Sequence, residues 1–543
     1  MLQRYKTLFL RFLKDKWFML AVSVTAVLAY SFFVFNFSPN VEDLSFDLYY
    51  GSNNLLVSAG RFGTVILDKV LNIYAFRPMI MPFLGIMTLV ATAILWCCQF
   101  KKISGDSLSR FTYVIFACFF IAAPLLNEVL IYTNQSFSIP LCFFLVTVSI
   151  ILIDEWQESR ANMYWAIAAL TLVLAIYESF VAVFISGLMC CFLVRRLYGT
   201  AHSKRIVWNR LWLTLEALVL AIAFRYIVGA LLKNYMQPIL PGYSEYTTSY
   251  INWHDRPFLE ALHTFFSTVW LNYFIAGAYY LPIAIFDGAL IAAFVCGLVL
   301  AIRRKSKLIA VLFAVIILTN FAMPVFLGQS MLYRACQVFG FFAAFVLMIL
   351  AQSVSTMRWR KARIGAAALI LLLLFYQIND MNKWFFVNNL RYNEDVRNFT
   401  KIGNDLRDNY EAKPVVFVGL YRYTDSVMRY VGVLADSNIG RWLCEKTDYI
   451  PESTKKKKYV MQSCKLLEGT FSSWGVVTKG LDFDYAYDPN YFVFEFLRGL
   501  GFECMEGGDY LKEAQEAAIS MPMFPNRGYI LDTGPFLVVN FGM

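Results

Sequence analysis

The sequence predicts a mainly α-helical protein that crosses a membrane many times and carries a C-terminal α/β domain. Hydrophobic residues make up 59% of its 543 residues, and the mean hydropathy is +0.54. A soluble protein of this size does not carry so large an apolar share. Long apolar runs alternate with short basic segments, and after Tyr376 the composition becomes polar and charged. These observations predict a membrane domain over 1–380 and a separate domain over 381–543.

We expect about eleven spanning helices, because that many apolar runs approach the length that a bilayer requires. They are 17–37, 78–99, 111–126, 139–153, 163–177, 178–194, 211–233, 281–302, 307–327, 335–353 and 363–380. The first run is too long for a signal peptide and no small-residue cleavage site follows it, so we expect it to be retained. Residues 163–194 resemble one long helix, but a tight hairpin at 176–179 puts the next basic loop on the same side as the others.

The basic residues indicate which side of the membrane each loop faces. They gather before the first run and in every second later loop, whereas the intervening loops hold few. The positive-inside rule then places the N-terminus in the cytoplasm and loops 38–77 and 234–280 outside, together with the C-terminal domain. The formal net charge of +10 is explained by these loops, so it does not indicate a nucleic-acid partner.

The C-terminal segment contains patterns of both strand and helix. Residues 413–419 form a short apolar run bounded by turn residues, and 529–540 has the pattern of a terminal hairpin. Residues 425–436 and 490–501 have helical patterns. No Gly-rich phosphate loop, Cys/His metal pattern or nucleophile elbow occurs there, so we expect a small α/β domain without a metal site.

The loop after the first span is the candidate catalytic segment. It holds Glu42, Asp43 and Asp47 close to an apolar helix end. A carboxylate at the mouth of a cavity between helices can act as a general base that takes a proton from a hydroxyl attacking a sugar. The alternative is that these acids are simply solvated, as most surface carboxylates are.

Two arginines are candidates for binding a phosphate. Arg61 lies in the same loop as the acids, and Arg334 is nearly alone in a short loop that opens a late helix. Guanidinium is well shaped for phosphate, and a lone cation beside hydrocarbon usually has an anionic partner. The alternatives are an interfacial anchor for Arg61 and a structural ion pair for Arg334.

Further candidates lie at the ends of other apolar runs. Glu128 and Tyr132 follow the third run, and Glu178 lies in the expected hairpin. A buried unpaired carboxylate is costly, so we expect each acid to face a polar cavity or to pair with an arginine.

The order of these motifs resembles that of the Gtr-type bacterial glucosyltransferases that modify O-antigens, in the GT-C superfamily. The motifs are the acidic pair after the first span, Gly60-Arg61, Asn127-Glu128 with Tyr132, Tyr177-Glu178-Ser179, and Arg334. The end of the chain, from Met521 to Asn540, also resembles the end of that family's chains. The likeness covers most of the length, and it depends on the order of motifs that are each short.

The resemblance implies an inverting hexosyltransferase of the bacterial cytoplasmic (inner) membrane. Its donor would be undecaprenyl-phosphate glucose, and its acceptor a cell-surface glycan such as O-antigen, part of lipopolysaccharide. It implies Asp43 as base with Glu42 beside it, although family sites often show two aspartates there, so which acid is the base stays open. Arg61 and Arg334 would hold the departing lipid phosphate. A divalent ion, Mg²⁺ or Mn²⁺, would fit between Glu42 or Asp43 and the phosphate, but the sequence does not require it.

Two alternatives remain. A flippase or transporter of a lipid-linked saccharide would be no enzyme, and it would keep ionisable residues near the middle of the membrane rather than at helix ends. An enzyme of the same fold would act on a protein or teichoic acid.

Overall fold

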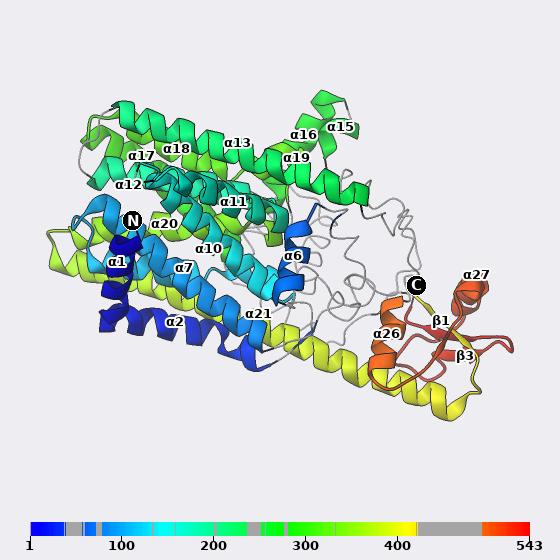
Figure 1. Cartoon of the computed structure of the whole chain (residues 1–543). Helices are drawn as coiled ribbons and strands as arrows, with labels where there is room; N and C mark the ends of the chain where they lie inside the picture. Colours follow the sequence, from blue (N-terminus) through cyan, green and yellow to red (C-terminus); the bar gives the residue numbers. More distant parts are fainter. Residues whose placement is uncertain are drawn as a thin grey trace. The chain divides into compact units, whose positions relative to one another are not determined.

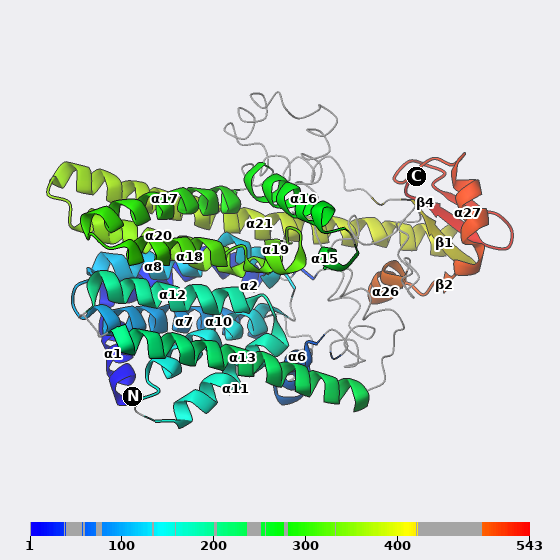
Figure 2. The same ribbon diagram turned by 90° about the horizontal axis from the view of Figure 1, so that it is seen from above.

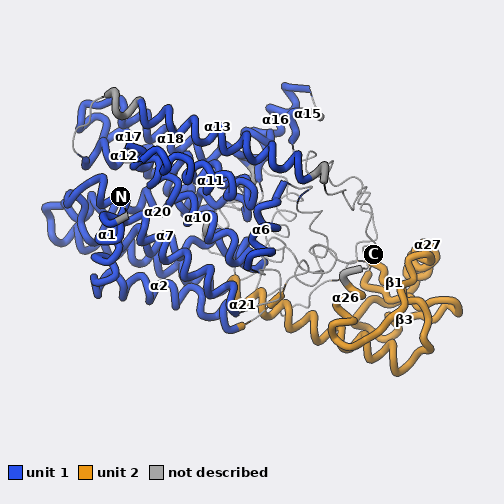
Figure 3. The backbone as a smooth tube through the Cα atoms, viewed as in Figure 1, with its two compact units in different colours: residues 1–35, 53–383 blue, residues 36–52, 384–543 orange. Residues whose placement is uncertain are grey.

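The computed structural model of the chain describes residues 2–36, 38–39, 57, 60–71, 79–132, 135–157, 159–199, 204–235, 251–255, 257–275, 281–331, 333–419, 421 and 491–542. These residues fall into two compact units. Unit 1 comprises 1–35 and 53–383, and unit 2 comprises 36–52 and 384–543 (Figure 3).

Unit 1 is a bundle of apolar helices. Within the described ranges, nine helices are long and apolar enough to span a membrane, and α11 (Ala161–Ile176) and α18 (Lys307–Thr319) are shorter apolar helices. Figures 1 and 2 show the helices running alongside one another, with α1 (Leu2–Lys14) lying across them. The prediction of a mainly α-helical polytopic membrane protein is therefore confirmed.

Each expected span overlaps a helix, but the span expected over 307–327 is divided between α18, which ends at Thr319, and the separate short helix α19 (Ala322–Leu327). In addition to α11 and α18, the helices are α2 (Lys16–Phe35), α7 (Ile80–Ser104), α8 (Arg110–Ile121), α10 (Gln135–Asp154), α12 (Phe180–Tyr198), α13 (Lys204–Tyr235), α17 (Leu281–Arg303), α20 (Gln337–Ser355) and α21 (Arg360–Asn409). The hairpin is confirmed, since α11 ends at Ile176 and α12 begins at Phe180. The sides of the membrane that the loops face stay a prediction.

Short elements connect the long helices. They are α6 (Phe62–Leu71), η1 (Pro124–Leu126), α9 (Asn127–Leu130), α15 (Asn252–Asp255), α16 (Phe258–Val269), the π-helix η2 (Trp270–Ile275), α19 (Ala322–Leu327) and η4 (Tyr333–Ala335). Helix α6 lies in the loop between the first two expected spans. Its Phe62 and Val65 pack against Ala175 of α11, with Val228 and Leu232 of α13 around them.

Helix α21 continues well beyond the apolar run that predicted it. The expected span ended at residue 380, whereas the helix ends at Asn409. Beyond 380, buried residues recur every three or four positions, at Trp384, Asn388, Arg391 and Phe399 among others. This spacing keeps one face of an α-helix covered, so the helix persists although its composition has become polar.

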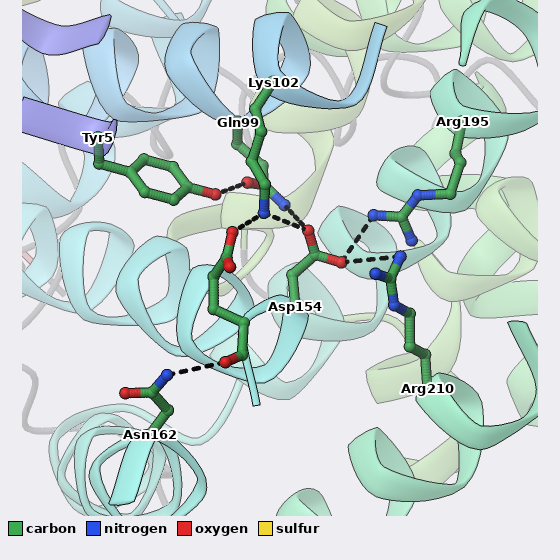
Figure 4. Close-up of polar contacts among 8 residues, drawn as sticks. Tyr5, Gln99, Lys102, Asp154, Asn162, Arg195 and Arg210 are labelled. Carbon is green, nitrogen blue, oxygen red and sulfur yellow. Dashed lines mark hydrogen bonds and ion pairs between the residues drawn. The ribbon is translucent and has the colours of Figure 1, made fainter. Parts of the chain in front are cut away.

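A buried ion cluster joins helices at one end of unit 1 (Figure 4). Asp154, the last residue of α10, accepts from Lys102 Nζ at 2.9 Å and Arg195 Nη2 at 2.6 Å, and Arg210 Nη1 lies 3.2 Å from it. These cations come from α7, α12 and α13, and the side chain of Asp154 is 8% exposed. The Asp154 cluster therefore ties four helices to a single carboxylate.

Two neighbouring residues extend the Asp154 cluster to α1. Gln99 donates from Nε2 to Asp154 Oδ2 at 3.4 Å, and Tyr5 of α1 donates its hydroxyl to Gln99 Oε1. Lys102 also pairs with Glu155. The N-terminal helix is thus held to the bundle by the same network.

Unit 2 contains a four-stranded mixed sheet with strand order β2-β1-β4-β3. β1 (Pro414–Val418) is parallel to β2 (Met505–Glu506) and β4 (Leu537–Asn540), and β3 (Ile530–Asp532) is antiparallel to β4. The sheet packs against α27 (Leu511–Ala518), and α26 (Tyr491–Gly499) precedes β2. The expected strand at 413–419, helix at 490–501 and terminal hairpin are present. The expected helix at 425–436 lies outside the described residues.

We expect the Asp154→Asn variant to lose about 3–5 kcal/mol of stability, since Arg195 and Arg210 would keep their charges in a buried place without a full anionic partner, and Lys102 would keep only Glu155. The thermal unfolding midpoint of the purified full chain in detergent measures this loss. Asp106→Asn is the matched control, because Asp106 is 83% exposed and, among the described residues, pairs with Lys101 at the same end of the bundle. Equal midpoints for the two variants would contradict a structural role for the Asp154 cluster.

Candidate functional site

The candidate site is built around Tyr177, which lies between α11 and α12. Its backbone is extended, with φ −152° and ψ 110°, because the chain reverses there from one helix into the next. The side chain is 8% exposed, and the guanidinium carbon of Arg61 lies 5.1 Å from its ring centroid. Arg61 immediately precedes α6, whose packing against α11 brings the two residues together.

Arg334 belongs to the same site although it is far away in the sequence. It lies in η4, donates from Nη1 to the hydroxyl of Tyr132 at 2.6 Å, and has its guanidinium carbon 5.3 Å from the Tyr132 ring centroid. Burial raises the pKa of Tyr177 above its ordinary value, and the positive charges of both Arg61 and Arg334 oppose that rise. Both predicted phosphate-binding arginines therefore lie near enough to Tyr177 to influence its ionisation.

Gln337, the first residue of α20, fixes Arg334 against the α11–α12 hairpin. Ser179 donates its hydroxyl to Gln337 Oε1 at 2.6 Å, and Gln337 Nε2 donates to the backbone oxygen of Arg334. Gln337 is 5% exposed. Because the side-chain amide of Gln337 hydrogen-bonds to both Ser179 and Arg334, η4 is tied to the start of α12.

Glu178 pairs with an arginine, which is one of the two environments predicted for it. Its partner is Arg225 of α13, whose Nη2 also lies 3.5 Å from the backbone oxygen of Gly60. Gly60 has φ +75°, and a Cβ there would lie 2.7 Å from Arg225 Nη2. Glycine at position 60 therefore permits both the left-handed backbone and the close approach of Arg225.

Glu128 lies close to this group. It is the second residue of α9, is 4% exposed, and α9 contacts η4. Burial raises the pKa of Tyr333, the residue before Arg334, and the carboxylate of Glu128 raises it further. The structure thus brings Arg61, Glu128, Tyr132, Glu178 and Arg334 to the same end of unit 1.

The predicted acids of the first loop, Glu42, Asp43 and Asp47, lie outside the described residues. The start of that loop is described, and it is anchored on α21 within unit 2. Arg391 Nη2 donates to the backbone oxygen of Pro39 at 2.6 Å, and Asn388 Nδ2 donates to that of Ser38 at 3.2 Å. Arg391 is 1% exposed, so its charge is used in holding the chain just before Glu42.

Sequence reasoning did not identify Arg225 and Gln337 as part of the site. Arg225 did leave a signal, because it is a charged residue inside an apolar run that is long enough to span a membrane. Gln337 left none, since polar residues are common at the first turn of a helix. In the described part of the chain, no group of three or more His, Cys, Asp and Glu could hold a metal ion.

This arrangement is suited to binding an anion at the end of an apolar bundle. A guanidinium held against an aromatic ring is restricted in orientation, and its planar fork of N–H groups matches a phosphate. Less freedom is then lost when an anion binds. Arg61 lies within cation–π distance of the Tyr177 ring, and Arg334 within the same range of the Tyr132 ring, to whose hydroxyl it also donates.

Two solved structures are similar to the chain, and both are of the oligosaccharyltransferase of Archaeoglobus fulgidus. One is tethered by a disulfide bond to an acceptor peptide with the NVT sequon, with 11% identity, a TM-score of 0.35, and coverage of 76% of this chain and 62% of that one. The other, in complex with Zn and sulfate, has 10% identity, a TM-score of 0.34, and coverage of 89% and 62%. The chain thus spans less than two thirds of that protein's length.

A comparison with curated protein sequences finds no match. Residues 31–351, however, match the family described as Glucosyl transferase GtrII. This range is more than half of the chain, and it contains Arg61, Tyr132, Tyr177, Arg225 and Arg334. The chain therefore belongs to the GtrII glucosyl transferase family.

Proposed function

We propose that the chain transfers a hexose, glucose, from undecaprenyl-phosphate glucose to a cell-surface glycan such as O-antigen, with inversion at the anomeric carbon. Membership of a glucosyl transferase family supports the sugar and the reaction type. The observation that supports the donor class is the pair of arginines, Arg61 and Arg334, each of which lies over a tyrosine ring at the same end of an apolar bundle.

The proposed chemistry needs a base and a stabilised leaving group. Asp43 or Glu42 takes the proton of the acceptor hydroxyl as its oxygen attacks the anomeric carbon. The bond between that carbon and the phosphate oxygen breaks, and its electron pair stays on the lipid phosphate. Arg61 and Arg334 face the charge that develops there, and because they are already oriented they need not reorganise during the reaction.

The proposed setting is the bacterial cytoplasmic membrane, with the N-terminus in the cytoplasm and the arginine pair on the outer side. The Asp154 cluster supports this orientation, because its cations belong to the basic loops and lie at the opposite helix ends from Arg61 and Arg334. A lipid-linked donor in the outer leaflet would then place its phosphate at the level of the arginines and its chain along the apolar helices.

We expect Asp43→Asn or Glu42→Gln to lower transfer by about 10²–10⁴-fold, the usual contribution of a positioned general base. The measurement is transfer of labelled glucose from undecaprenyl-phosphate glucose to glycan by the purified protein. The acid whose substitution lowers the transfer rate more is the general base. Asp106→Asn, at the other end of unit 1, should retain full activity. Unchanged transfer by both loop variants would remove the assigned base, and movement of the intact lipid-linked sugar without transfer would favour the flippase.

We expect Arg334→Gln to lower kcat by about 10²–10³-fold, because one donor to the developing phosphate charge is lost. Arg334→Lys keeps the charge but not the planar fork, so it should recover only part of the rate. Arg61→Gln should behave in the same way, and Arg303→Gln, an exposed arginine at the opposite end, is the control. If the variants change only the use of the glycan, with donor kinetics unaffected, the arginines do not bind the lipid phosphate.

We expect Arg225 and Glu178 to position Arg61 as a unit. Arg225→Gln should raise KM for the lipid donor, since Gly60 loses a contact next to Arg61. Glu178→Gln should raise this KM by as much or more, because it leaves Arg225 charged and partly buried without its carboxylate partner. The double variant should then be no worse than the worse single variant. Additive losses in this cycle would show that the two residues act separately.

A further inference from the structure

Three buried side-chain oxygen atoms lie close to the contact between α9 and α21. They are Asn127 Oδ1, Gln377 Oε1 and Asp380 Oδ2, and none has a hydrogen-bond partner among the described residues. Asn127 is 0% exposed, Gln377 2% and Asp380 9%. Buried polar atoms without partners are rare in folded proteins, and each needs a physical explanation.

The fold places these three residues together. Asn127 begins α9 and donates from Nδ2 to the backbone oxygen of Met381 in α21 at 3.3 Å. Gln377 is one turn before Met381 on the same buried face, which also includes Ile370 and Leu374. Asp380 is adjacent to Met381 and three residues from Gln377, so both residues lie within about one helical turn, ~5.4 Å of helix length, of the residue that Asn127 contacts.

All three atoms are acceptors, and the group carries one negative charge. The amide nitrogen of Asn127 is already used on Met381, so the amide cannot reverse to supply a donor without losing that bond. A buried water can donate to two acceptors, but it leaves the carboxylate charge uncompensated in an apolar bundle, which is costly. A small cation satisfies the acceptors and the charge together.

The ligand set indicates which cation fits. Carboxylate and amide oxygens without nitrogen or sulfur suit hard cations. One carboxylate balances one positive charge, whereas a divalent ion would leave excess charge buried. Asp380 makes no ion pair in the described part of the chain, and the one cation that acts on it electrostatically is the exposed Lys383 of the same helix.

We propose that Asn127, Gln377 and Asp380 bind a monovalent alkali cation of the Na⁺ class between α9 and α21. The bound ion holds α21 against α9, whose next residue is Glu128, and α9 contacts η4, which carries Arg334. The ion therefore stabilises the end of the bundle that contains the candidate site. This inference goes beyond the proposed transfer reaction and is tested without it.

The test is the thermal unfolding midpoint of the purified full chain in detergent at pH 8. Titrations with NaCl, with choline chloride keeping the ionic strength constant, should raise the midpoint of the wild type to a plateau. Asp380→Asn should abolish the Na⁺-dependent rise. Gln377→Leu should shift the half-saturating Na⁺ concentration upward by at least about tenfold, the scale on which supporting groups affect metal sites.

Two comparisons separate cation binding from general effects. In choline chloride, Asp380→Asn should be at least as stable as the wild type, because it removes a buried charge that lacks a partner. Asp287→Asn is the matched control, since Oδ1 of Asp287 in α17 also lacks a hydrogen-bond partner, and this variant should keep the full response to Na⁺.

Four results would overturn the proposal. First, the wild type could have the same midpoint in NaCl and in choline chloride, or Asp380→Asn could keep the response to Na⁺. The wild type could also respond to MgCl₂ or CaCl₂ but not to NaCl. Finally, Asp380→Asn could be less stable than the wild type in choline chloride. If lowering the pH alone stabilises the wild type, a proton rather than a cation neutralises Asp380. Each readout is a stability, so failure here leaves the proposed transfer reaction untouched.

Discussion

Unit 1 depends on one carboxylate, Asp154, placed among cations from three other helices. Lys102, Arg195 and Arg210 would repel one another if no anion lay between them. Withdrawing such charges from water costs free energy, so the cluster is weak evidence for added stability. It is a strong constraint on register, because sliding any of these helices by one turn would leave a charge buried without a partner.

The arginines at the two ends of the bundle lie in different surroundings. At the Asp154 end the cations are paired with carboxylates, and the network extends through Gln99 to Tyr5 of α1. At the other end Arg61 and Arg334 lie over the rings of Tyr177 and Tyr132. At that end Arg225 also pairs with Glu178, so the arginines there are held by tyrosine rings, hydrogen bonds and an ion pair rather than by one shared carboxylate.

The Tyr177 site is assembled by packing rather than by sequence proximity. Helix α6 brings Arg61 to Tyr177 through its contact with α11, and Gln337 ties Arg334 to the start of α12. Arg225, from the middle of a long apolar helix, reaches both Glu178 and Gly60. Changes in helix packing therefore alter the spacing of the two stacked arginines.

The sequence alone determined the class of fold, because apolar length and the alternation of basic loops are local properties that do not depend on partners. It also indicated the hairpin before Phe180, the terminal strands, and Arg61, Glu178 and Arg334 as candidates, since charges at the ends of apolar runs are conspicuous. The partners of those charges came only from the tertiary structure. Arg225 pairs with Glu178, and Asn127 meets α21, because separate helices pack side by side, and no local pattern in a chain encodes which distant surfaces will touch.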